Sequence, residues 1–198
     1  MTEENTQEIR RNPYTPWFVV AAFVLPVAMA YAIFFFADVT SFTNRGEIFN
    51  PVVDITSLEL TDETGKIIPE KTLRYKWRFI SFVGSDCDEA CNKRLRDSRQ
   101  VHKRFGKDSH RILRVIVHLE PASETLNNLI EAEYPDALNM NANAETVNAA
   151  FGGASKLYEN EIYIMDPMGN IMMRFTQDQP IQDFQFDMKK LLKASQIG

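Results

Sequence analysis

The sequence predicts an α/β domain, built on a central mixed sheet flanked by helices, behind one N-terminal transmembrane helix. Three observations lead to this prediction. An apolar run without charge covers residues 16–37. In the rest of the chain, short apolar runs alternate with helix-forming segments, as they do in α/β folds. The only two cysteines, Cys87 and Cys91, stand where an apolar run passes into a helix-forming segment. About 150 residues follow the first apolar run, which is a common size for a single core.

The apolar run at residues 16–37 is long enough to cross a bilayer, since a helical span needs about 20 apolar residues. Arg10 and Arg11 precede it, and Asp38 follows it. By the positive-inside rule, residues 1–15 form a cytoplasmic tail and the chain after Asp38 lies on the other side. We therefore expect a single-pass protein of the inner (cytoplasmic) membrane with a periplasmic, or otherwise extracytoplasmic, carboxyl-terminal domain.

A cleaved signal peptide is the alternative interpretation of this run. The triplets Ala28-Met-Ala30 and Ala30-Tyr-Ala32 resemble the small-residue cleavage site of such peptides. The apolar run continues beyond them to Phe36, and this length favours a retained helix. A buried helix of a soluble protein is disfavoured, because the run is apolar on every face.

A polar connector over residues 38–51 is expected to lead into the domain at residues 52–198. The first element of the domain is predicted as a hairpin, whose turn takes a positive φ at Gly65. The central element is a buried strand over residues 77–83, where the chain is almost continuously apolar. The remaining predicted elements, in chain order, are a helix from Cys91 to Phe105, a strand over 111–119, a helix over 124–134 capped by Ser123, a helix over 144–151 capped by Asn143, a hairpin over 161–176 and a last helix that begins at Pro180.

The order of these elements predicts the topology. A helix between the first two core strands implies that these strands are parallel, and the late hairpin adds an antiparallel pair. This order is a thioredoxin-like plan. Cys87 and Cys91 then lie at the carboxyl end of the first core strand, where open α/β sheets place their functional sites.

The charge balance excludes one class of function. The formal net charge is −5 and the pI is about 5.3, so no phosphate-binding surface and no nucleic-acid partner are expected. Basic residues do gather in the helix that follows Cys91, and we interpret them as a solvated helix face. They are Lys93, Arg94, Arg96, Arg99, Lys103 and Arg104.

The two thiols can carry redox or soft-metal chemistry. Cys87 would lie just before the helix and Cys91 in its first turn. The helix dipole favours a thiolate on Cys87, whereas the negative charges of Asp86, Asp88 and Glu89 oppose it, so the sign of its pKa shift stays open. The pair can close a disulfide if the two Cα atoms lie within about 7 Å, and two thiolates can bind Cu(I). Zn(II) would need four ligands, and the chain has too few thiols and no clustered histidines to supply them.

A purely structural disulfide is the simpler alternative, because the predicted compartment is oxidising. A bridge that encloses only the three residues between Cys87 and Cys91 stabilises a fold little through chain entropy. We therefore favour a redox or metal role for the pair over a structural one.

The sequence around the cysteines resembles the SCO/SenC family, thioredoxin-like copper chaperones of cytochrome c oxidase assembly. The shared positions near the thiols are Trp77, Phe82, Gly84, Cys87, Cys91 and Leu95. Three further segments, 60–66, 117–125 and 163–169, are similar to landmarks of that family. In the second of them Glu120 replaces an Asp of the family motif, and the family's Arg is missing. The resemblance covers roughly residues 52–195 and implies copper as a candidate cofactor, with Cys87 and Cys91 as metal ligands.

One departure from the family pattern concerns the copper site. The family carries a copper-ligating His five residues before the Tyr of the late strand, and the matching residue here is Tyr158. A phenol is a poor ligand for Cu(I), and it serves Cu(II) only when deprotonated. His118 can replace the missing ligand if its strand end faces the thiols. We consider it more consistent with a hydrogen-bonded histidine.

The leading hypothesis is a membrane-anchored, SCO-like accessory factor for cytochrome c oxidase assembly. Its partner would be an oxidase subunit or another assembly factor, with which it exchanges disulfides or to which it hands Cu(I). Because the His ligand is missing, we favour thiol exchange, with Cys87 as the attacking thiol and Cys91 as the resolving one. Two alternatives remain: a non-catalytic assembly scaffold with a vestigial site, and a general periplasmic thiol oxidoreductase.

Overall fold

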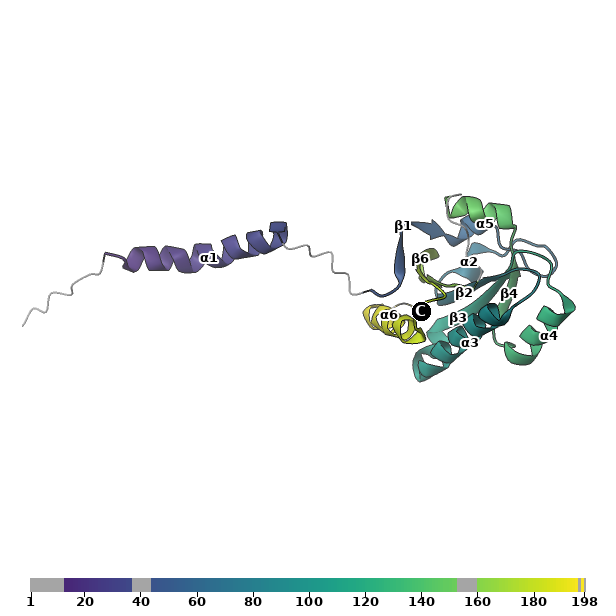
Figure 1. Cartoon of the computed structure of the whole chain (residues 1–198). Helices are drawn as coiled ribbons and strands as arrows, with labels where there is room; N and C mark the ends of the chain where they lie inside the picture. Colours follow the sequence, from purple (N-terminus) through teal and green to yellow (C-terminus); the bar gives the residue numbers. More distant parts are fainter. Residues whose placement is uncertain (1–12, 37–43, 153–159, 196, 198) are drawn as a thin grey trace, which may run out of the picture. The chain divides into compact units, whose positions relative to one another are not determined.

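The computed structural model describes residues 13–36, 44–152, 160–195 and 197 (Figure 1). The chain divides into two units, residues 1–43 and residues 44–198. The first unit contains the helix α1 (Thr15–Phe36), and the second contains every strand of the sheet.

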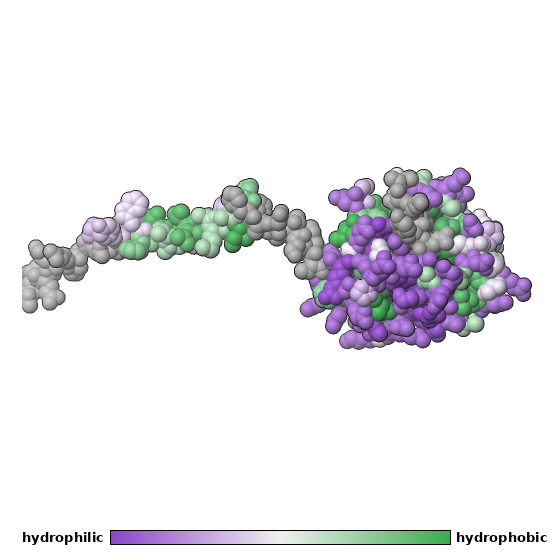
Figure 2. Space-filling view, in the orientation of Figure 1, coloured by the Kyte–Doolittle hydropathy of each residue, from purple (hydrophilic) through white to green (hydrophobic). Residues whose placement is uncertain are grey.

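The helix α1 has the length and composition of a membrane span. It is 22 residues long, and its segment Pro16–Ile33 has a mean hydropathy of 2.0 with none of its surface buried. Figure 2 shows the contrast between this largely apolar helix and the mostly hydrophilic visible face of the domain. Pro26 lies inside the helix, as is tolerated in membrane helices.

The domain is built on a six-stranded mixed sheet in the order β1-β6-β5-β2-β3-β4. The pairs β2–β3 and β3–β4 are parallel, while β2–β5, β5–β6 and β1–β6 are antiparallel. The expected thioredoxin-like α/β fold is therefore confirmed, including the parallel pairing of the first two core strands. The strands are β1 (Glu47–Asp54), β2 (Trp77–Val83), β3 (Ile112–His118), β4 (Leu138–Asn141), β5 (Ile162–Met165) and β6 (Asn170–Phe175).

Helices cover both faces of the sheet (Figure 1). On one face Ile80 and Phe82 of β2 pack with Val147 and Phe151 around α5, and on the other Phe79 packs against α6. Every residue of β2 is buried, so burial of its apolar side chains, at roughly 1.5–3 kcal/mol each, makes it the centre of the core. The helices of the domain are η1 (Ile55–Leu58), α2 (Glu70–Leu73), α3 (Glu89–Arg104), η2 (Gly106–Arg111), α4 (Glu124–Glu133), α5 (Ala144–Ala150) and α6 (Ile181–Ala194).

Three parts of the domain differ from the prediction. The expected early hairpin is reduced to a single bridge between Thr61 and Ile67, although Gly65 does take a positive φ of 79°. Residues 47–51, expected in the connector, instead belong to β1, which pairs with the distant strand β6. The strand β4 was not predicted, because its sequence Leu-Asn-Met-Asn has no β-branched residue and buries only Met140.

The prediction of a fully solvated basic face on α3 is wrong for Arg94. Its side chain is only 3% exposed. It donates a hydrogen bond to the carbonyl of Thr176, which precedes α6, and it pairs with Asp97 at 3.3 Å. A buried arginine is tolerated here because backbone and carboxylate oxygens satisfy its donors. The contact fixes the start of α3 beside the segment that leads into α6.

The landmark Asp166-Pro-Met-Gly169 is a structural turn at the end of the sheet away from the cysteines. Asp166 Oδ1 accepts hydrogen bonds from the backbone N–H groups of Met168 (2.8 Å) and Asn170 (2.9 Å). Gly169 has a φ of 98°, and a Cβ there would lie 3.3 Å from the Arg74 guanidinium. The landmark thus shapes the β5–β6 hairpin and has no contact with the thiols.

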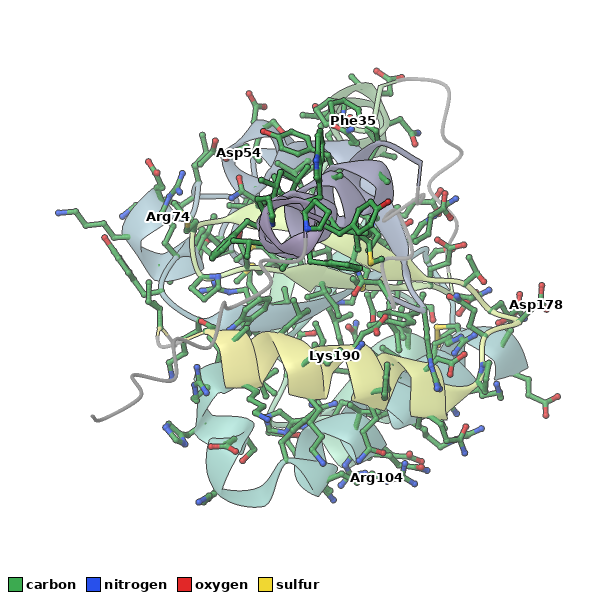
Figure 3. All side chains as sticks on the ribbon, turned by 90° about the vertical axis from the view of Figure 1, so that its left-hand side faces the viewer. Phe35, Asp54, Arg74, Arg104, Asp178 and Lys190 are labelled. Carbon is green, nitrogen blue, oxygen red and sulfur yellow. A yellow bond between two sulfur atoms is a disulfide. The ribbon has the colours of Figure 1, made fainter. Side chains whose placement is uncertain are left out.

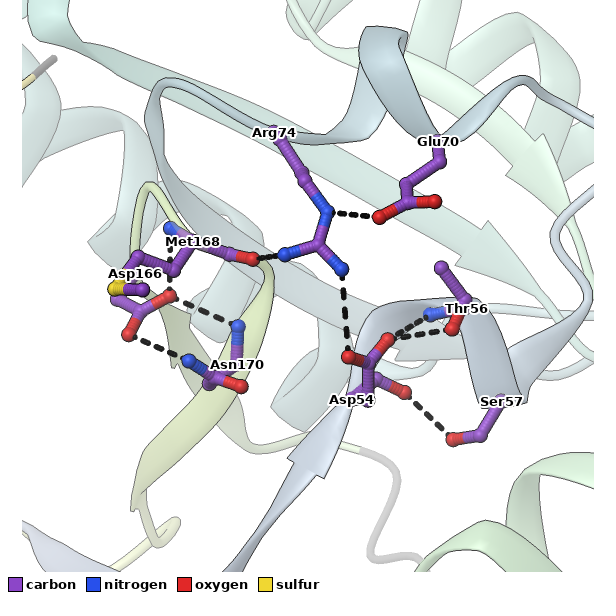
Figure 4. Close-up of polar contacts among 8 residues, drawn as sticks. All are labelled: Asp54, Thr56, Ser57, Glu70, Arg74, Asp166, Met168 and Asn170. Atoms are coloured by element: carbon purple, nitrogen blue, oxygen red, sulfur yellow. Dashed lines mark hydrogen bonds and ion pairs between the residues drawn. The ribbon is translucent and has the colours of Figure 1, made fainter.

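Arg74 ties this turn to the preceding segments, as Figure 4 shows. It donates to the carbonyl of Met168, pairs with Glu70 on α2 and reaches Asp54 at 3.5 Å. Asp54 in turn caps η1 by accepting from the N–H of Thr56 at 2.8 Å. These contacts join β1, α2 and the β5–β6 turn into one corner of the domain.

Candidate redox site at the Cys87–Cys91 disulfide

The cysteines lie where β2 passes into α3. Gly84 and the residues after it end the strand, and Asp88 caps the helix with its side chain accepting from the N–H of Cys91 at 2.8 Å. Cys87 therefore lies just before the helix and Cys91 in its first turn, as the spacing predicted. This is the carboxyl end of the parallel strands β2 and β3.

Cys87 and Cys91 form a disulfide with a Cα–Cα distance of 5.2 Å. This distance lies within the range that a disulfide requires, so the predicted closeness of the two thiols is confirmed. The two cysteine residues differ in exposure. Cys91 is 6% exposed and packs with Leu95 and Val83, whereas Cys87 is half-buried at the surface. A thiol from another molecule can therefore reach Cys87 more easily than Cys91.

Two of the carboxylates around the pair, those of Asp86 and Asp88, have local partners. Asp88 caps α3, and Asp86 accepts a hydrogen bond from the hydroxyl of Ser123. The backbone N–H of Ser123 also donates to the carbonyl of Ser85 at 2.8 Å. The loop that carries Cys87 is thereby fastened to the start of α4, a link that the sequence did not reveal.

A small cavity opens beside the buried sulfur. It has a volume of about 150 Å³ and is lined by Val83, Gly84, Asp86, Asp88, Cys91 and Asn160. Asn160 takes a left-handed φ of 74°, which asparagine tolerates better than most residues. The cavity is large enough for a few water molecules.

His118 belongs to a different cleft. It is 7% exposed, and its Nε2 lies 3.4 Å from Asn139 Oδ1, while its Nδ1 has no hydrogen-bond partner among the described residues. Burial lowers the pKa of His118, and the contact with Asn139 offsets this only in part. The cleft has a volume of about 310 Å³, and neither cysteine lines it. The structure thus gives no contact between His118 and the sulfurs.

The donor set for a metal is incomplete in the described part of the chain. Tyr158, at the position of the family's His ligand, lies outside the described residues. Among the residues that the structure does describe, no three His, Cys, Asp or Glu side chains are grouped to hold a metal ion. Reduction of the disulfide would supply two thiolates, which suit Cu(I), and a third ligand would have to come from elsewhere.

A buried carboxyl near this end of the sheet was not singled out in the sequence. Glu161, next to the cavity residue Asn160, is 5% exposed and accepts a hydrogen bond from the hydroxyl of Tyr163 at 3.2 Å. Burial raises the pKa of Glu161, although Arg174 lies 3.5 Å away. The same Arg174 has a raised pKa, chiefly through its hydrogen bond to Glu47 at 2.7 Å. Glu47 is therefore the main ion-pair partner of Arg174, and the negative charge of Glu161 is only partly balanced.

Comparison with known protein families gives one match. The family described as the transmembrane-like, thioredoxin-like, C-terminal domain matches residues 77–195, more than half of the chain. The match includes both cysteines and ends within the segment after α6. No curated protein sequence matches the chain.

Solved structures with the same fold include Sco proteins. Arabidopsis thaliana ScoI with copper bound has a TM-score of 0.55 at 15% identity, over 76% of this chain and 99% of that one. BsSco, described as a member of the Sco family of cytochrome c oxidase assembly proteins with a disulfide switch, has a TM-score of 0.52 at 13% identity, over 73% and 96%. A thiol:disulfide interchange protein from Bacteroides sp. has a TM-score of 0.51 at 14% identity, over 76% and 91%. The similarity to Sco structures expected from the sequence is confirmed at the level of the fold.

Proposed function

The chain belongs to the transmembrane-like, thioredoxin-like C-terminal domain family, and from this premise we propose that it is a membrane-anchored, Sco-like accessory factor for cytochrome c oxidase assembly. It acts by thiol–disulfide exchange through Cys87 and Cys91. The observation that carries the proposal is a disulfide at the carboxyl end of β2 with one accessible and one buried sulfur. The membrane anchor is α1, with the amino terminus in the cytoplasm and the domain on the periplasmic side.

The exchange proceeds through a mixed disulfide. A client thiolate attacks Sγ of Cys87, the Cys87–Cys91 bond breaks, and its electron pair leaves on Cys91, which takes up a proton from solvent. The second client thiolate then attacks the client sulfur of the mixed disulfide and releases Cys87 as a thiolate. The client dithiol has lost two electrons and this chain has gained them. The same steps in reverse order, starting from the reduced cysteines, reduce a client disulfide. A dithiol protein must then reduce Cys87–Cys91 again.

The local structure favours Cys87 as the exchanging sulfur. It is the more accessible of the two, and it lies at the amino end of α3, where the helix dipole stabilises a thiolate once the bond is broken. Cys91 is buried against Leu95 and Val83, which suits a resolving thiol that reacts only within the chain.

Copper handling is the second chemistry of the same pair, with Cu(I) as cargo. The Arabidopsis ScoI structure contains copper, and that protein shares the fold. In this chain the matching third ligand is Tyr158, which is less suited to Cu(I) than imidazole. Thiol exchange is therefore the primary proposal.

Trapping of mixed disulfides tests the exchange. In cells that express the full chain with Cys91→Ser, the resolving thiol is absent. The Cys87 thiolate then attacks a client disulfide, one client sulfur leaves as a thiolate, and the mixed disulfide should accumulate as a covalent complex that dithiothreitol releases. Cys87→Ser should give at least tenfold less complex, because the remaining thiol is buried. An oxidase subunit or assembly factor in the complex supports the proposal. Equal trapping by both variants, or none by either, overturns it.

Copper titration separates exchange from metal transfer. The reduced full chain should hold Cu(I) more weakly than the Tyr158→His variant, by at least tenfold in dissociation constant, since the variant regains an imidazole ligand. Equal, tight binding by both chains would show that the preference for exchange over copper transfer is wrong.

A general thiol oxidoreductase is the second candidate function. The observation in its favour is the comparable fold similarity to the thiol:disulfide interchange protein from Bacteroides sp.. The trapping experiment distinguishes the two, because many unrelated clients on Cys91→Ser indicate a general oxidoreductase and one or a few oxidase-related clients indicate an assembly factor.

A further inference from the structure

The chain enters the domain along α6. Asp187 of α6 accepts hydrogen bonds from the backbone N–H groups of Arg45 (2.7 Å) and Gly46 (2.8 Å). The Arg45 guanidinium pairs with Asp183 one turn earlier on α6. Gly46 is packed so closely that a Cβ would lie 2.6 Å from Phe175. The start of the domain is therefore fastened to one helix.

The connection to the proposed anchor is short. Only residues 37–43 separate α1, which ends at Phe36, from Asn44. At about 3.3–3.6 Å per residue, this segment reaches at most about 30 Å. If α1 spans the bilayer, as the proposed function holds, the chain beside α6 cannot move farther than that from the lipid headgroups.

The solvent-facing side of α6 is cationic. Its two acidic residues are engaged with the entering chain, Asp183 with Arg45 and Asp187 with backbone N–H groups. The exposed residues in its carboxyl-terminal half include three lysines, Lys189, Lys190 and Lys193. This side is basic although the whole chain carries a net charge of −5.

The neighbouring helix α3 extends this basic surface. Figure 3 shows Lys190 on α6 with Arg104 of α3 below it, and a hydrogen bond of 3.0 Å from Arg104 to Gln185 joins the two helices. Lys103, next to Arg104, is also exposed.

An exposed aromatic ring lies within the basic surface. Phe186 is 38% exposed, with the Arg45 guanidinium 4.2 Å and the Lys190 ammonium 4.3 Å from its ring centroid. An aromatic ring surrounded by long basic side chains is typical of surfaces that rest at a lipid interface, where the ring enters the headgroup layer and the cations meet lipid phosphates.

We propose that this surface, defined by Phe186, Lys189, Lys190, Lys193, Lys103 and Arg104, docks on anionic lipid headgroups of the membrane that holds the anchor. The short connection confines the surface near the bilayer, and its charge complements anionic lipid. Each lysine or arginine near an anionic surface strengthens binding by roughly fivefold, so the surface is sufficient for docking within the tethered volume.

Lysine reactivity in nanodiscs tests the proposal. The full chain is inserted into discs of phosphatidylcholine alone or with phosphatidylglycerol, and acetylation rates of individual lysines are read by mass spectrometry. In the phosphatidylglycerol discs Lys189, Lys190 and Lys193 should react roughly three- to tenfold more slowly, and about 0.5 M salt should abolish the difference. Lys66 and Lys71, on other segments, should change less than twofold.

Charge-matched variants provide the control. Lys189→Glu/Lys193→Glu should remove the protection of Lys190, while Lys66→Glu/Lys71→Glu, with the same change in net charge, should keep it. Equal acetylation rates of the three lysines in both kinds of disc would overturn the proposal. Slower acetylation that depends on protein concentration in phosphatidylcholine discs would show self-association and would overturn it as well. Insertion into the discs is read separately by flotation, so failure of the anchor is distinguished from failure of the lipid contact.

Discussion

Arg78 shows how a single buried charge can organise its surroundings. It lies on the central strand β2, is 1% exposed, and donates to the carbonyls of Leu73 and Thr72 at the end of α2. No carboxylate pairs with it in the described part of the chain, and desolvation lowers its pKa to about 10. The residue therefore serves as a cap that joins α2 to the sheet.

We predict that Arg78→Met lowers the free energy of unfolding by about 2–4 kcal/mol, since it removes the donor from the buried carbonyl of Leu73 and from the part-buried carbonyl of Thr72. Arg96→Met, an exposed position on α3, should change it by less than about 0.5 kcal/mol. Urea unfolding followed by circular dichroism measures both. A similar loss in both variants would show that Arg78 does not act as a cap.

The buried carboxyl of Glu161 is expected to make the free energy of unfolding depend on pH. Burial raises its pKa in the folded state, although Arg174 and the hydrogen bond from Tyr163 act in the opposite direction. The folded chain thus binds this proton at higher pH than the unfolded chain. The stabilisation of the folded state by protonated Glu161 is fully present below the pKa of the unfolded chain, near 4.5. It is lost as the pH rises through the higher pKa of the folded state.

We therefore predict that Glu161→Gln flattens this dependence. The free energy of unfolding of the wild-type chain, minus that of the variant, should decrease as the pH rises above about 4.5. His118 has a lowered pKa and acts in the opposite sense, since its contribution grows as the pH rises toward 6.5, and the subtraction removes its effect. Urea midpoints from pH 4 to pH 7 give the comparison, with the exposed Glu131→Gln as the control. A difference independent of pH would contradict the assignment.

At the level of the elements, the start of α3 determines how the two sulfurs are presented. Asp88 accepts from the N–H of Cys91 and so fixes the first turn that carries the buried sulfur. Asp86 and Ser123 hold the preceding loop against α4. The helix cap and the loop contact act together on one short segment.

We predict that Asp88→Ala lowers the free energy of unfolding by about 1 kcal/mol, the usual value of a lost helix cap, while Asp88→Asn costs only a few tenths. Because the first turn of α3 would then fray, Cys91 should also become more reactive in the reduced chain. Thermal unfolding and the alkylation rate of Cys91 provide the measurements. Unchanged stability in Asp88→Ala would argue against the cap.

The elements also show what the sequence could predict. The strand β2 and the helices α4 and α5 were predicted because their signals are local: a continuous apolar run for β2, and cap residues Ser123 and Asn143 for the helices. The strand β4 was missed because its sequence has weak strand propensity. The pairing of β1 with β6 was missed because it joins segments that lie far apart in the chain.

Some features of the candidate site could likewise be predicted from the sequence, and others could not. The spacing of Cys87 and Cys91 at a strand–helix junction was sufficient to predict their closeness, because it depends on local geometry. The burial of Cys91, the bond from Ser123 to Asp86 and the position of Glu161 depend on tertiary packing. Patterns of neighbouring residues in the sequence cannot reveal such contacts. Arg94 is a further example, because it lies among basic residues on α3 and is nevertheless buried.

At the scale of the whole molecule, a candidate membrane helix precedes a thioredoxin-like domain that carries the Cys87–Cys91 disulfide. Thiol–disulfide exchange requires neither a basic groove nor a phosphate-binding loop. The net charge of −5 is compatible with a protein client.

We expect the Cys87–Cys91 disulfide to open by attack of a client thiolate on Cys87. The reaction of the oxidised full chain with glutathione, quenched by alkylation and with both cysteines mapped by mass spectrometry, measures this directly. We predict glutathione on Cys87 and the alkyl group on Cys91, in at least tenfold excess over the opposite pattern. Glutathione predominantly on Cys91, or a disulfide that resists exchange in the folded chain, would contradict it.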